Sequence, residues 1–371
     1  MAILVINSGS SSIKYALFDQ ENEQELQRGV FNGLDSSRGV GSEHEQVIRQ
    51  VLDSLLGQFR IDGIGHRVVH GGVDFHQATL IDRDVLEKIR SFNHLAPLHN
   101  PVCLQGIETV LELTATTPQV AVFDTGYFHS LPEYAWRYAL PKELADELQV
   151  RRYGFHGISH HYVASQAAEV LRQPLDSLKL ITLHLGNGAS AAAIRYGLPI
   201  DTSMGMTPLE GLVMGSRSGD LDPSVPLYLQ TYGGMRPSEV DELMNCRAGL
   251  RGLCGESDMR QIRERIGQAD PDARLALQIY AHRLRKYIGA YMAVLDGCDA
   301  LVFTGGIGEH DAALRAEVCD GLGSFGLCID SMRNTVGKVR INHPQTLPAI
   351  LVVPTDEELA IARQTRRCLG S

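Results

Sequence analysis

Polar and glycine-rich segments follow several short apolar runs of this sequence, where open α/β sheets bind their ligands. The first is NSGSSSIK at residues 7–14, whose small side chains let backbone N–H groups approach a phosphate. The second is GHRVVHGG at residues 65–72, in which Arg67 interrupts an apolar run. An arginine at such a position is either paired structurally or faces a ligand cleft, and the residues leave both readings open.

Two later segments have the same character. Residues 205–222, with the core TPLEGLVMGSRSGD, are too irregular for a helix and too long for a simple turn, which is typical of a functional loop. Arg217 lies there between small residues, so its guanidinium can reach a ligand without crowding. TGGIGE at residues 304–309 follows an apolar run and should precede a helix, a favourable place for a nucleotide. PLHNP at 97–101 and FDT at 123–125 are further candidates.

Short strands and amphipathic helices should position these segments. Apolar runs and helical spacing predict strands at 3–6, 13–18, 62–69, 119–123, 178–185, 191–196, 300–303 and 349–353, and helices at 43–56, 101–113, 274–295 and 357–369. Residues 21–41 are polar and are expected to hold a strand end and a loop. Strand, small-residue turn and strand occur at 3–18 and again at 178–196, one pair opening each half. This repetition suggests a duplicated fold with a cleft between the copies.

Two motifs imitate other chemistries. Gly186-x-Gly188-x-x-Ala191 resembles a dinucleotide fingerprint, but Gly197 and Pro199 interrupt the long helix which that fingerprint requires, so a hairpin is expected. His156 and His160 have the i, i+4 spacing of a zinc pair. Gly157 argues against a helix there, and Ser159 is the better predicted N-cap. The spacing GxxxxGK[ST] of a P-loop does not occur.

Composition is that of a soluble globular enzyme, with 371 residues, 44% hydrophobic and 21% charged, a length that favours two domains. The formal net charge of −10 argues against nonspecific nucleic-acid binding. The seven cysteines are scattered without a CxxC pair, as expected for reduced thiols in a cytosol. With neither an apolar membrane span nor a basic leader in the sequence, we expect a cytoplasmic protein that contacts no membrane.

The segments at 7–12, 65–72, 207–220 and 304–309 resemble the acetate kinase family, in the right order over nearly the whole chain. The resemblance implies an α/β fold of two duplicated ribonuclease H-like domains, of the actin, Hsp70 and sugar kinase type, with an ATP cleft between them. It implies an N-terminal domain at 1–128 completed by 358–371, and a nucleotide-binding and dimerisation domain at 129–357. The implied reaction is reversible transfer of the ATP γ-phosphoryl group to acetate by direct in-line displacement, giving acetyl phosphate and ADP.

The resemblance also assigns residues. Asp124, Arg217 and His156 are implied to be catalytic, with His99 and His184 in supporting positions. Arg67, Val69, Leu98, Phe155 and Pro208 are implied to bind the carboxylate substrate, the last four around its methyl group. Asn7 and Glu357, with Asp124, are implied to organise Mg²⁺, or Mn²⁺ in its place. Nucleotide contacts are implied for Lys14, His184, Leu185, Gly186, Asn187, Gly188, Asp258, Met259, Arg260, Gly305, Gly306, Ile307 and Gly308.

The sequence departs from the family pattern at a few positions. Asp356 and His310 each stand where the family usually has asparagine, and Asp356 puts the metal site in question. The histidine after Asp124, His129, comes one position later than expected, and the segment between Phe18 and Glu43 is short. A propionate or butyrate kinase is the alternative within the same class, and a nucleotide-binding module without catalysis is the alternative from another class. A homodimer is implied by the family alone.

Overall fold

The computed structural model describes residues 2–9, 12–34 and 43–370, which form two compact units. The first unit contains residues up to 129, residues 155–159 and the segment from 356 onward; the second contains 130–154 and 160–355. Ser10 and Ser11 of the predicted phosphate segment, and 35–41 of the predicted loop at 21–41, lie outside the described residues. The predicted domain ranges stay a prediction.

The first unit is built on a mixed sheet in the order β3-β2-β1-β4-β6-β5. Its strands are β1 (Ala2–Ser8), β2 (Ser12–Asp19), β3 (Glu25–Asn32), β4 (Ile61–Val68), β5 (Thr79–Leu80) and β6 (Gln119–Phe123). β1, β2 and β3 form an antiparallel meander, whereas β1, β4 and β6 run parallel. The carboxyl ends of three neighbouring strands therefore meet at one edge of the sheet.

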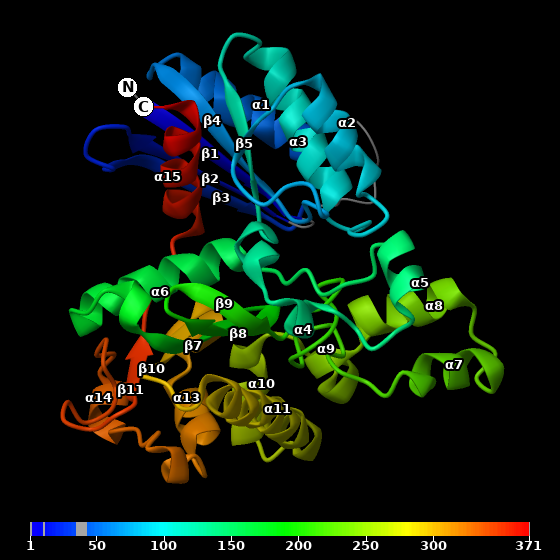
Figure 1. Cartoon of the computed structure of the whole chain (residues 1–371), viewed down its shortest axis with the longest axis vertical. Helices are drawn as coiled ribbons and strands as arrows, with labels where there is room; N and C mark the ends of the chain where they lie inside the picture. Colours follow the sequence, from blue (N-terminus) through cyan, green and yellow to red (C-terminus); the bar gives the residue numbers. More distant parts are fainter. Residues whose placement is uncertain (1, 10–11, 35–42, 371) are drawn as a thin grey trace. The chain divides into compact units, whose positions relative to one another are not determined.

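Helices cover both faces of this sheet (Figure 1). α1 (Glu43–Leu56) and α3 (Asn100–Leu113) pack together on one face, and α15 (Glu357–Leu369) lies across β1, β4 and β6 on the other. α2 (Arg83–Ser91) packs beside α3. α1 forms where it does because Ile48, Val51, Leu52 and Leu55 recur at helical spacing and are all buried.

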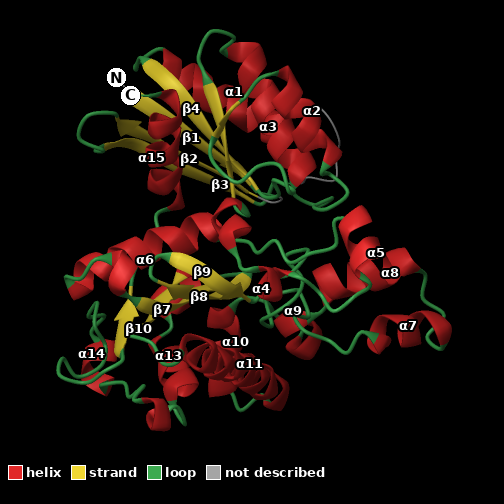
Figure 2. Cartoon of the chain, in the orientation of Figure 1, coloured by secondary structure: helices red, strands yellow, loops and turns green. Residues whose placement is uncertain are grey.

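The second unit contains a sheet in the order β11-β10-β7-β8-β9. Its strands are β7 (Lys179–Leu185), β8 (Ala189–Arg195), β9 (Leu198–Thr202), β10 (Ala300–Thr304) and β11 (Ala349–Val352). Its helices are α4 (Glu133–Trp136), α5 (Lys142–Glu147), α7 (Ser224–Thr231), α8 (Pro237–Glu242), α9 (Gly249–Cys254), α10 (Met259–Gly267), α11 (Pro271–Leu295), α12 (Gly305–His310), α13 (Ala312–Cys319) and α14 (Ser331–Thr335). α6 (Gly157–Leu171) begins in the first unit and continues here. Figure 2 shows this sheet between α6 and α11.

The two sheets repeat one topology. In each, an antiparallel meander of three strands is followed by two strands that run parallel to the first strand of the meander. β7, β8, β10 and β11 thus correspond to β1, β2, β4 and β6. This agrees with the duplicated α/β fold expected from the two predicted hairpins.

The structure corrects three expectations and confirms a fourth. Residues 25–32 form the full strand β3, where a strand end and loop were expected. α6 begins at Gly157, so Ser159 is not its N-cap. The glycines at 305–308 lie within α12, not in a turn before it. β7 and β8 form an antiparallel hairpin, as expected in place of a dinucleotide fold.

No described helix has the length and apolar character needed to cross a bilayer.

Candidate active site

Arg67 forms a charged cluster with Asp124 and Asn7 at the carboxyl ends of β4, β6 and β1. Its Nε donates to Asp124 Oδ1 over 3.0 Å, and its Nη2 lies 2.5 Å from Asp124 Oδ2. Its Nη1 donates to Asn7 Oδ1 over 3.2 Å. The strands are neighbours in one parallel register, so residues far apart in sequence end side by side. The structure therefore shows that Arg67 is paired, and a paired guanidinium has further N–H donors with which to bind a ligand.

Burial and charge oppose each other in this cluster. The Asp124 side chain is 1% exposed and that of Arg67 17% exposed. Burial disfavours the charged guanidinium, but the carboxylates of Asp124 and Glu357 outweigh that effect and raise the pKa of Arg67. Burial raises the pKa of Asp124, against the lowering effect of Arg67. Removing either partner would leave the other as an uncompensated buried charge, which typically costs about 3–5 kcal/mol.

The start of α15 brings two more carboxylates to this cluster. Glu357 acts electrostatically on both Arg67 and Asp124, and Glu358 Oε1 accepts from Asn7 Nδ2 over 3.1 Å. No three His, Cys, Asp or Glu side chains of the described chain gather to hold a metal ion by themselves. Mg²⁺ usually takes one or two carboxylates and completes its shell with waters and substrate phosphates. Asp124 and Glu357, with the Asn7 amide, fit that donor set.

His156 precedes α6 in a strained conformation, with φ +57°. The left-handed region is unfavourable for a residue with a Cβ, and such strain is concentrated at functional sites. Next to it, the Gly157 N–H donates to the Asp124 carbonyl over 2.9 Å. A Cβ on Gly157 would lie 2.3 Å from that oxygen, so only glycine permits the approach. The backbone of His156 is therefore tied to the end of β6, where Asp124 lies.

The residues predicted for the acyl pocket differ in burial. Val69 and Phe155 are buried in the first unit, and the Phe155 ring meets the His70 ring edge-on with centroids 5.4 Å apart. Leu98 is 48% exposed, although it was predicted to line the same pocket. Pro208 is buried in the second unit. His99 stands at the N-terminus of α3 in the first unit.

The long loop at 205–222 holds Arg217 in the second unit. Its Nη1 donates to the Pro208 carbonyl over 3.1 Å, within the same loop. The loop is braced from outside: the Gly215 N–H donates to the Asn187 carbonyl over 3.0 Å, and the Leu250 N–H to the Met214 carbonyl over 2.9 Å. Gly249, at φ +61°, lies so close that a Cβ would be 2.2 Å from the Met214 carbonyl oxygen. The loop that carries Arg217 is thus ordered by backbone contacts.

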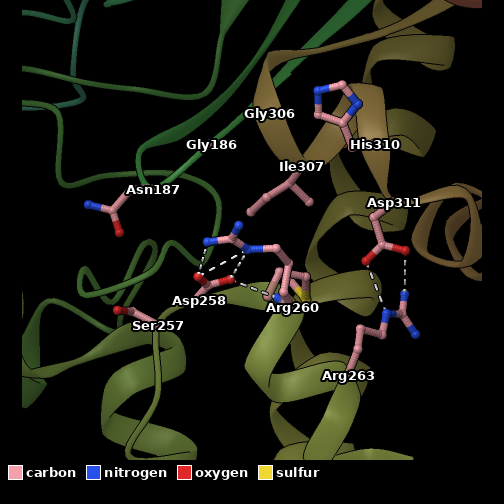
Figure 3. A pocket seen from close by; sticks show the side chains of 11 residues that line it. Gly186, Asn187, Ser257, Asp258, Arg260, Arg263, Gly306, Ile307, His310 and Asp311 are labelled. Atoms are coloured by element: carbon pink, nitrogen blue, oxygen red, sulfur yellow. Dashed lines mark hydrogen bonds and ion pairs between the residues drawn. The ribbon is translucent and has the colours of Figure 1, made fainter. Parts of the chain in front are cut away.

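A pocket of about 780 Å³ opens in the second unit (Figure 3). It is lined by Gly186, Asn187, Ser257, Asp258, Met259, Arg260, Arg263, Gly306, Ile307, His310 and Asp311. The structure thus brings together seven of the predicted nucleotide contacts, from the β7–β8 turn, the start of α10 and α12. The size suits a nucleotide, which pockets of about 300–1,000 Å³ accommodate.

Two ion pairs border the pocket. Asp258 caps α10 by accepting from the Arg260 N–H over 2.9 Å, and its carboxylate lies 2.6 Å from Arg260 Nη2. Arg263 donates to both carboxylate oxygens of Asp311, over 3.0 and 3.1 Å. Figure 3 shows both pairs. The Arg260 side chain is 88% exposed, so it can leave Asp258 for a ligand at little cost.

The other predicted nucleotide contacts lie elsewhere. Leu185, Gly305 and Gly308 are buried where the ends of β7 and β10 meet, and a Cβ on Gly305 would lie 2.7 Å from the Leu185 carbonyl oxygen. Gly188 belongs to the β7–β8 turn, outside the pocket lining. Lys14 is exposed on β2 of the first unit. Leu185, Gly188, Gly305 and Gly308 therefore adjoin lining residues in the chain without lining the pocket themselves, and Lys14 belongs to the other unit.

His184 lies on β7 beside His160, with ring centroids 6.4 Å apart. His160 is fully buried and bonded through its ring nitrogens to the hydroxyls of Thr182 and Ser190, each over 2.7 Å. Burial, followed by the neighbouring His184, lowers the pKa of His160 well below its usual value. His160 is therefore a neutral anchor of α6 on the sheet.

Several residues of the site escaped prediction. Ser257, Arg263 and Asp311 line the pocket, and His310 was noticed only as a departure from the family pattern. Glu309 Oε1 accepts from the backbone N–H groups of Gly305 and Thr355, over 2.9 and 3.2 Å, and so joins the ends of β10 and β11. Glu309 belongs to the TGGIGE segment that the sequence singled out, but no role had been predicted for it.

Two sheets of one repeated topology, with a charged cluster at the strand ends of the first, define a protein of the duplicated ribonuclease H-like class that includes actin and the sugar kinases. The family model described as the acetokinase family matches residues 2–363. The chain belongs to the acetokinase family.

Individual relatives agree with this assignment. The chain is 49% identical to an acetate kinase of Streptomyces avermitilis, over all of this chain and 98% of the relative. Its fold is similar to the crystal structure of Porphyromonas gingivalis acetate kinase, with a TM-score of 0.90 at 38% identity, covering 99% of each chain. It is equally similar to a propionate kinase from Francisella tularensis, with a TM-score of 0.91 at 40% identity and 99% coverage of each chain.

Proposed function

We propose that this protein is an acetate kinase that transfers the γ-phosphoryl group of ATP reversibly to acetate, forming acetyl phosphate and ADP. The observation that carries the proposal is the buried cluster of Arg67, Asp124 and Asn7 beside Glu357, in a chain of the acetokinase family. Such a cluster offers a fixed cation for a carboxylate substrate and hard oxygen donors for a metal–nucleotide complex. A pure nucleotide-binding module would not need the arginine.

The chemistry calls for charge rather than a base. A carboxylate is already ionised at neutral pH and can act as the nucleophile directly. Its difficulty is to approach an anionic phosphate, so catalysis consists of positioning and positive charge. We assign that charge to Arg67 and Arg217. The pairing of Arg67 with Asp124 stabilises the guanidinium in the low-dielectric interior before substrate binds.

His156 and the metal site complete the proposed machinery. His156 would donate a hydrogen bond to an equatorial phosphoryl oxygen as charge develops there. Asp124, Glu357 and Asn7 would hold Mg²⁺, or Mn²⁺ in its place, and the ion would neutralise phosphate charge when bound. The pocket lined by Asp258, Arg260 and Ile307 would take the adenosine part of ATP. A homodimer and a cytoplasmic location are part of this proposal and rest on the family.

A propionate kinase is the second candidate, because the chain is as similar to a solved propionate kinase as to a solved acetate kinase. Buried Val69 and Phe155 are proposed to contact the acyl group. A hydrophobic pocket discriminates one methylene by only about 10- to 200-fold, so propionate should also react.

The direct test is hydroxylamine trapping of the acyl phosphate, with Mg-ATP and acetate, propionate or butyrate supplied separately. We expect strong product with acetate, less with propionate and little with butyrate. A higher kcat/KM for propionate than for acetate would favour the second candidate. Product with none of the three acids, despite measured ATP binding, would overturn the proposed function.

Arg217→Ala tests the mechanism. Turnover should fall by roughly 10³-fold or more, by analogy with arginines that stabilise phosphoryl transfer, while ATP affinity stays nearly intact. Arg274→Ala is the matched control, since Arg274 is an exposed arginine of α11 in the same unit. Normal turnover by the Arg217→Ala enzyme would remove Arg217 from the mechanism.

A further inference from the structure

Arg28, on β3, contacts the start of α15 through both of its terminal nitrogens. Its Nη2 donates to both carboxylate oxygens of Asp356 over 3.0 Å each, and its Nη1 donates to Glu358 Oε2 over 3.1 Å. Its Nε donates to Glu25 Oε2 over 2.7 Å, on the outer side. One planar guanidinium thus donates charge-assisted hydrogen bonds to two carboxylates of α15 at once, which fixes their direction as well as their distance.

The two residues that Arg28 holds on α15 flank Glu357. Asp356 is also the N-cap of α15, accepting from the Leu359 N–H over 3.0 Å. With the residue before and the residue after both held, the backbone of Glu357 has little freedom to turn. Glu357 is the carboxylate to which we assign metal binding.

A second line of contacts runs from the same arginine to the catalytic cluster. Glu358, whose side chain is 7% exposed, accepts from Arg28 with one oxygen and from the Asn7 amide with the other. Asn7 in turn accepts from Arg67 with its amide oxygen. The Asn7 amide is therefore held in one orientation, because a flipped amide would point its NH₂ group at the guanidinium and its oxygen at a carboxylate.

Charge reinforces this geometry. Burial disfavours the charged form of Arg28, but Glu25, Asp356 and Glu358 outweigh burial and raise its pKa. Glu358, for its part, is a nearly buried carboxylate whose charge Arg28 compensates. The contacts form one connected network within the first unit, of the kind in which each member orients the next.

We propose that Arg28 is a positioning residue of the phosphotransfer site. It fixes the direction of Glu357 by holding Asp356 and Glu358, and it orients Arg67 through Glu358 and Asn7. The proposal rests on the proposed function, because Glu357 and Arg67 take their roles from it. Arg28 itself touches neither substrate nor metal.

The test compares Arg28→Met with Glu25→Gln. Partners that orient the ligands of a metal site typically contribute about 10- to 100-fold to affinity or activity, so kcat/KM for acetate in Arg28→Met should fall by that factor. The KM for ATP should change much less, because the pocket that we assign to adenosine is lined by residues of the other unit. Glu25→Gln removes only the outer partner of Arg28, whose side chain is 43% exposed, and should leave all constants unchanged.

A second measurement, metal binding, does not depend on turnover. Mn²⁺ binding in the presence of ADP, measured by electron paramagnetic resonance, should weaken about 10-fold in Arg28→Met and stay unchanged in Glu25→Gln. If Arg28→Met fails to fold, the double variant Arg28→Met/Glu358→Gln replaces it. That variant removes the uncompensated charge and keeps an oxygen that can accept from Asn7. The same loss of Mn²⁺ affinity is expected there.

A double-mutant comparison of Arg28→Met with Asn7→Ala tests whether Arg28 acts on kcat/KM through Asn7. Asn7→Ala should lower kcat/KM, and adding Arg28→Met should lower it further, but by less than Arg28→Met does alone, because the contacts with Asp356 and Glu358 act on Glu357 without Asn7. Wild-type constants in Arg28→Met would overturn the proposal, and full additivity of the two substitutions would overturn its route through Asn7. A wild-type enzyme that forms no acyl phosphate would instead contradict the proposed function, so the two failures are distinguishable.

Discussion

His156 holds a backbone conformation that residues other than glycine seldom adopt. Its neighbour Gly157 is fixed to the Asp124 carbonyl, at a distance that leaves no room for a Cβ. The chain therefore keeps a histidine where glycine would fit with less strain. Such a residue is expected where the side chain has a function that outweighs its cost in stability.

Two substitutions separate the strain at His156 from the function of its imidazole. His156→Gly and His156→Ala both remove the ring, so both should lower turnover equally, and by less than Arg217→Ala. Alanine keeps a Cβ in the left-handed region, so His156→Ala should unfold with a free energy about 1 kcal/mol lower than His156→Gly. Urea denaturation measures the difference. Equal stability of the two variants would show that the backbone is not strained there.

Residue types alone left the state of Arg67 open. An arginine in an apolar strand needs a partner or a cleft, and the partner is Asp124, 57 residues later. Their pairing depends on β4 and β6 being neighbours, which no local pattern encodes. The φ angle of His156 is likewise set by a tertiary contact. The sequence does identify polar residues in or after apolar runs. Three of these, Arg67, Asp124 and Asn7, lie together in the structure.

At the scale of elements, α15 packs against the face of β4 on which Gly63 and Gly65 lie. A Cβ on Gly65 would lie 2.3 Å from Thr365 Oγ1 and 2.8 Å from Ile361 Cγ2, both on α15. A Cβ on Gly63 would lie 2.4 Å from Leu369 Cδ1, also on α15. Because the helix and strand approach so closely, Glu357 at the start of α15 is held against the sheet that carries Arg67.

Gly65→Ala should therefore separate α15 from β4. The overpacking is expected to lower the free energy of unfolding by about 1–3 kcal/mol. Gly289→Ala is the matched control, since a Cβ there meets nothing within 4 Å in the middle of α11 and should be neutral or stabilising by up to about 1 kcal/mol. Chemical denaturation followed by circular dichroism compares them. A Gly65→Ala protein as stable as wild type would contradict this packing.

Elements with strong periodicity were predicted well, and edge elements were not. α1 and α15 have the predicted bounds because their apolar residues recur at helical spacing. β3 was missed because half of its residues, in ELQRGVFN, are polar and all of them are half-exposed or exposed at the sheet edge. Because β3 was not predicted, the role of Arg28 was not predicted either. Arg28 reaches α15 from β3, which pairs with β2.

At the scale of the whole molecule, buried histidines link stability to pH. His66 is 2% exposed and bonded to Gln119 over 2.8 Å. Burial lowers its pKa from 6.5 to about 4, against the raising effect of that hydrogen bond. Between these values the unfolded chain binds a proton that the folded chain does not. Acidification therefore favours unfolding. The free energy of unfolding should fall progressively as the pH drops from 6.5 to about 4.

His66→Gln should reduce this pH dependence. Linkage gives a loss of about 2 kcal/mol for His66 between pH 7 and pH 5, which a non-titrating glutamine would not contribute. His160 is expected to add a loss of the same sign. Unfolding free energies of wild type and His66→Gln at the two pH values measure the effect. Identical slopes would show that His66 accepts a proton in the folded state.

The duplicated architecture was predictable because two hairpins repeat in sequence, and the structure repeats the whole strand order around them. The insertions were not: α7, α8, α9, α10 and α11 all lie between β9 and β10, whereas α1 is the helix described between the corresponding strands β3 and β4. Family resemblance supplied the residue roles, which local physical patterns did not.

The position of α15 in the chain also has a consequence for protein synthesis. This helix covers a sheet whose first strand begins at Ala2, yet it follows every residue of the second unit. At about 5–20 residues per second, a ribosome would need on the order of tens of seconds to translate that unit. The nascent first unit must wait that long with an apolar sheet face uncovered. The first unit is thus the first to be translated and the last to be completed. Until α15 is made, the face of β4 that carries Gly63 and Gly65 is uncovered, and this is the face that a chaperone would have to shield.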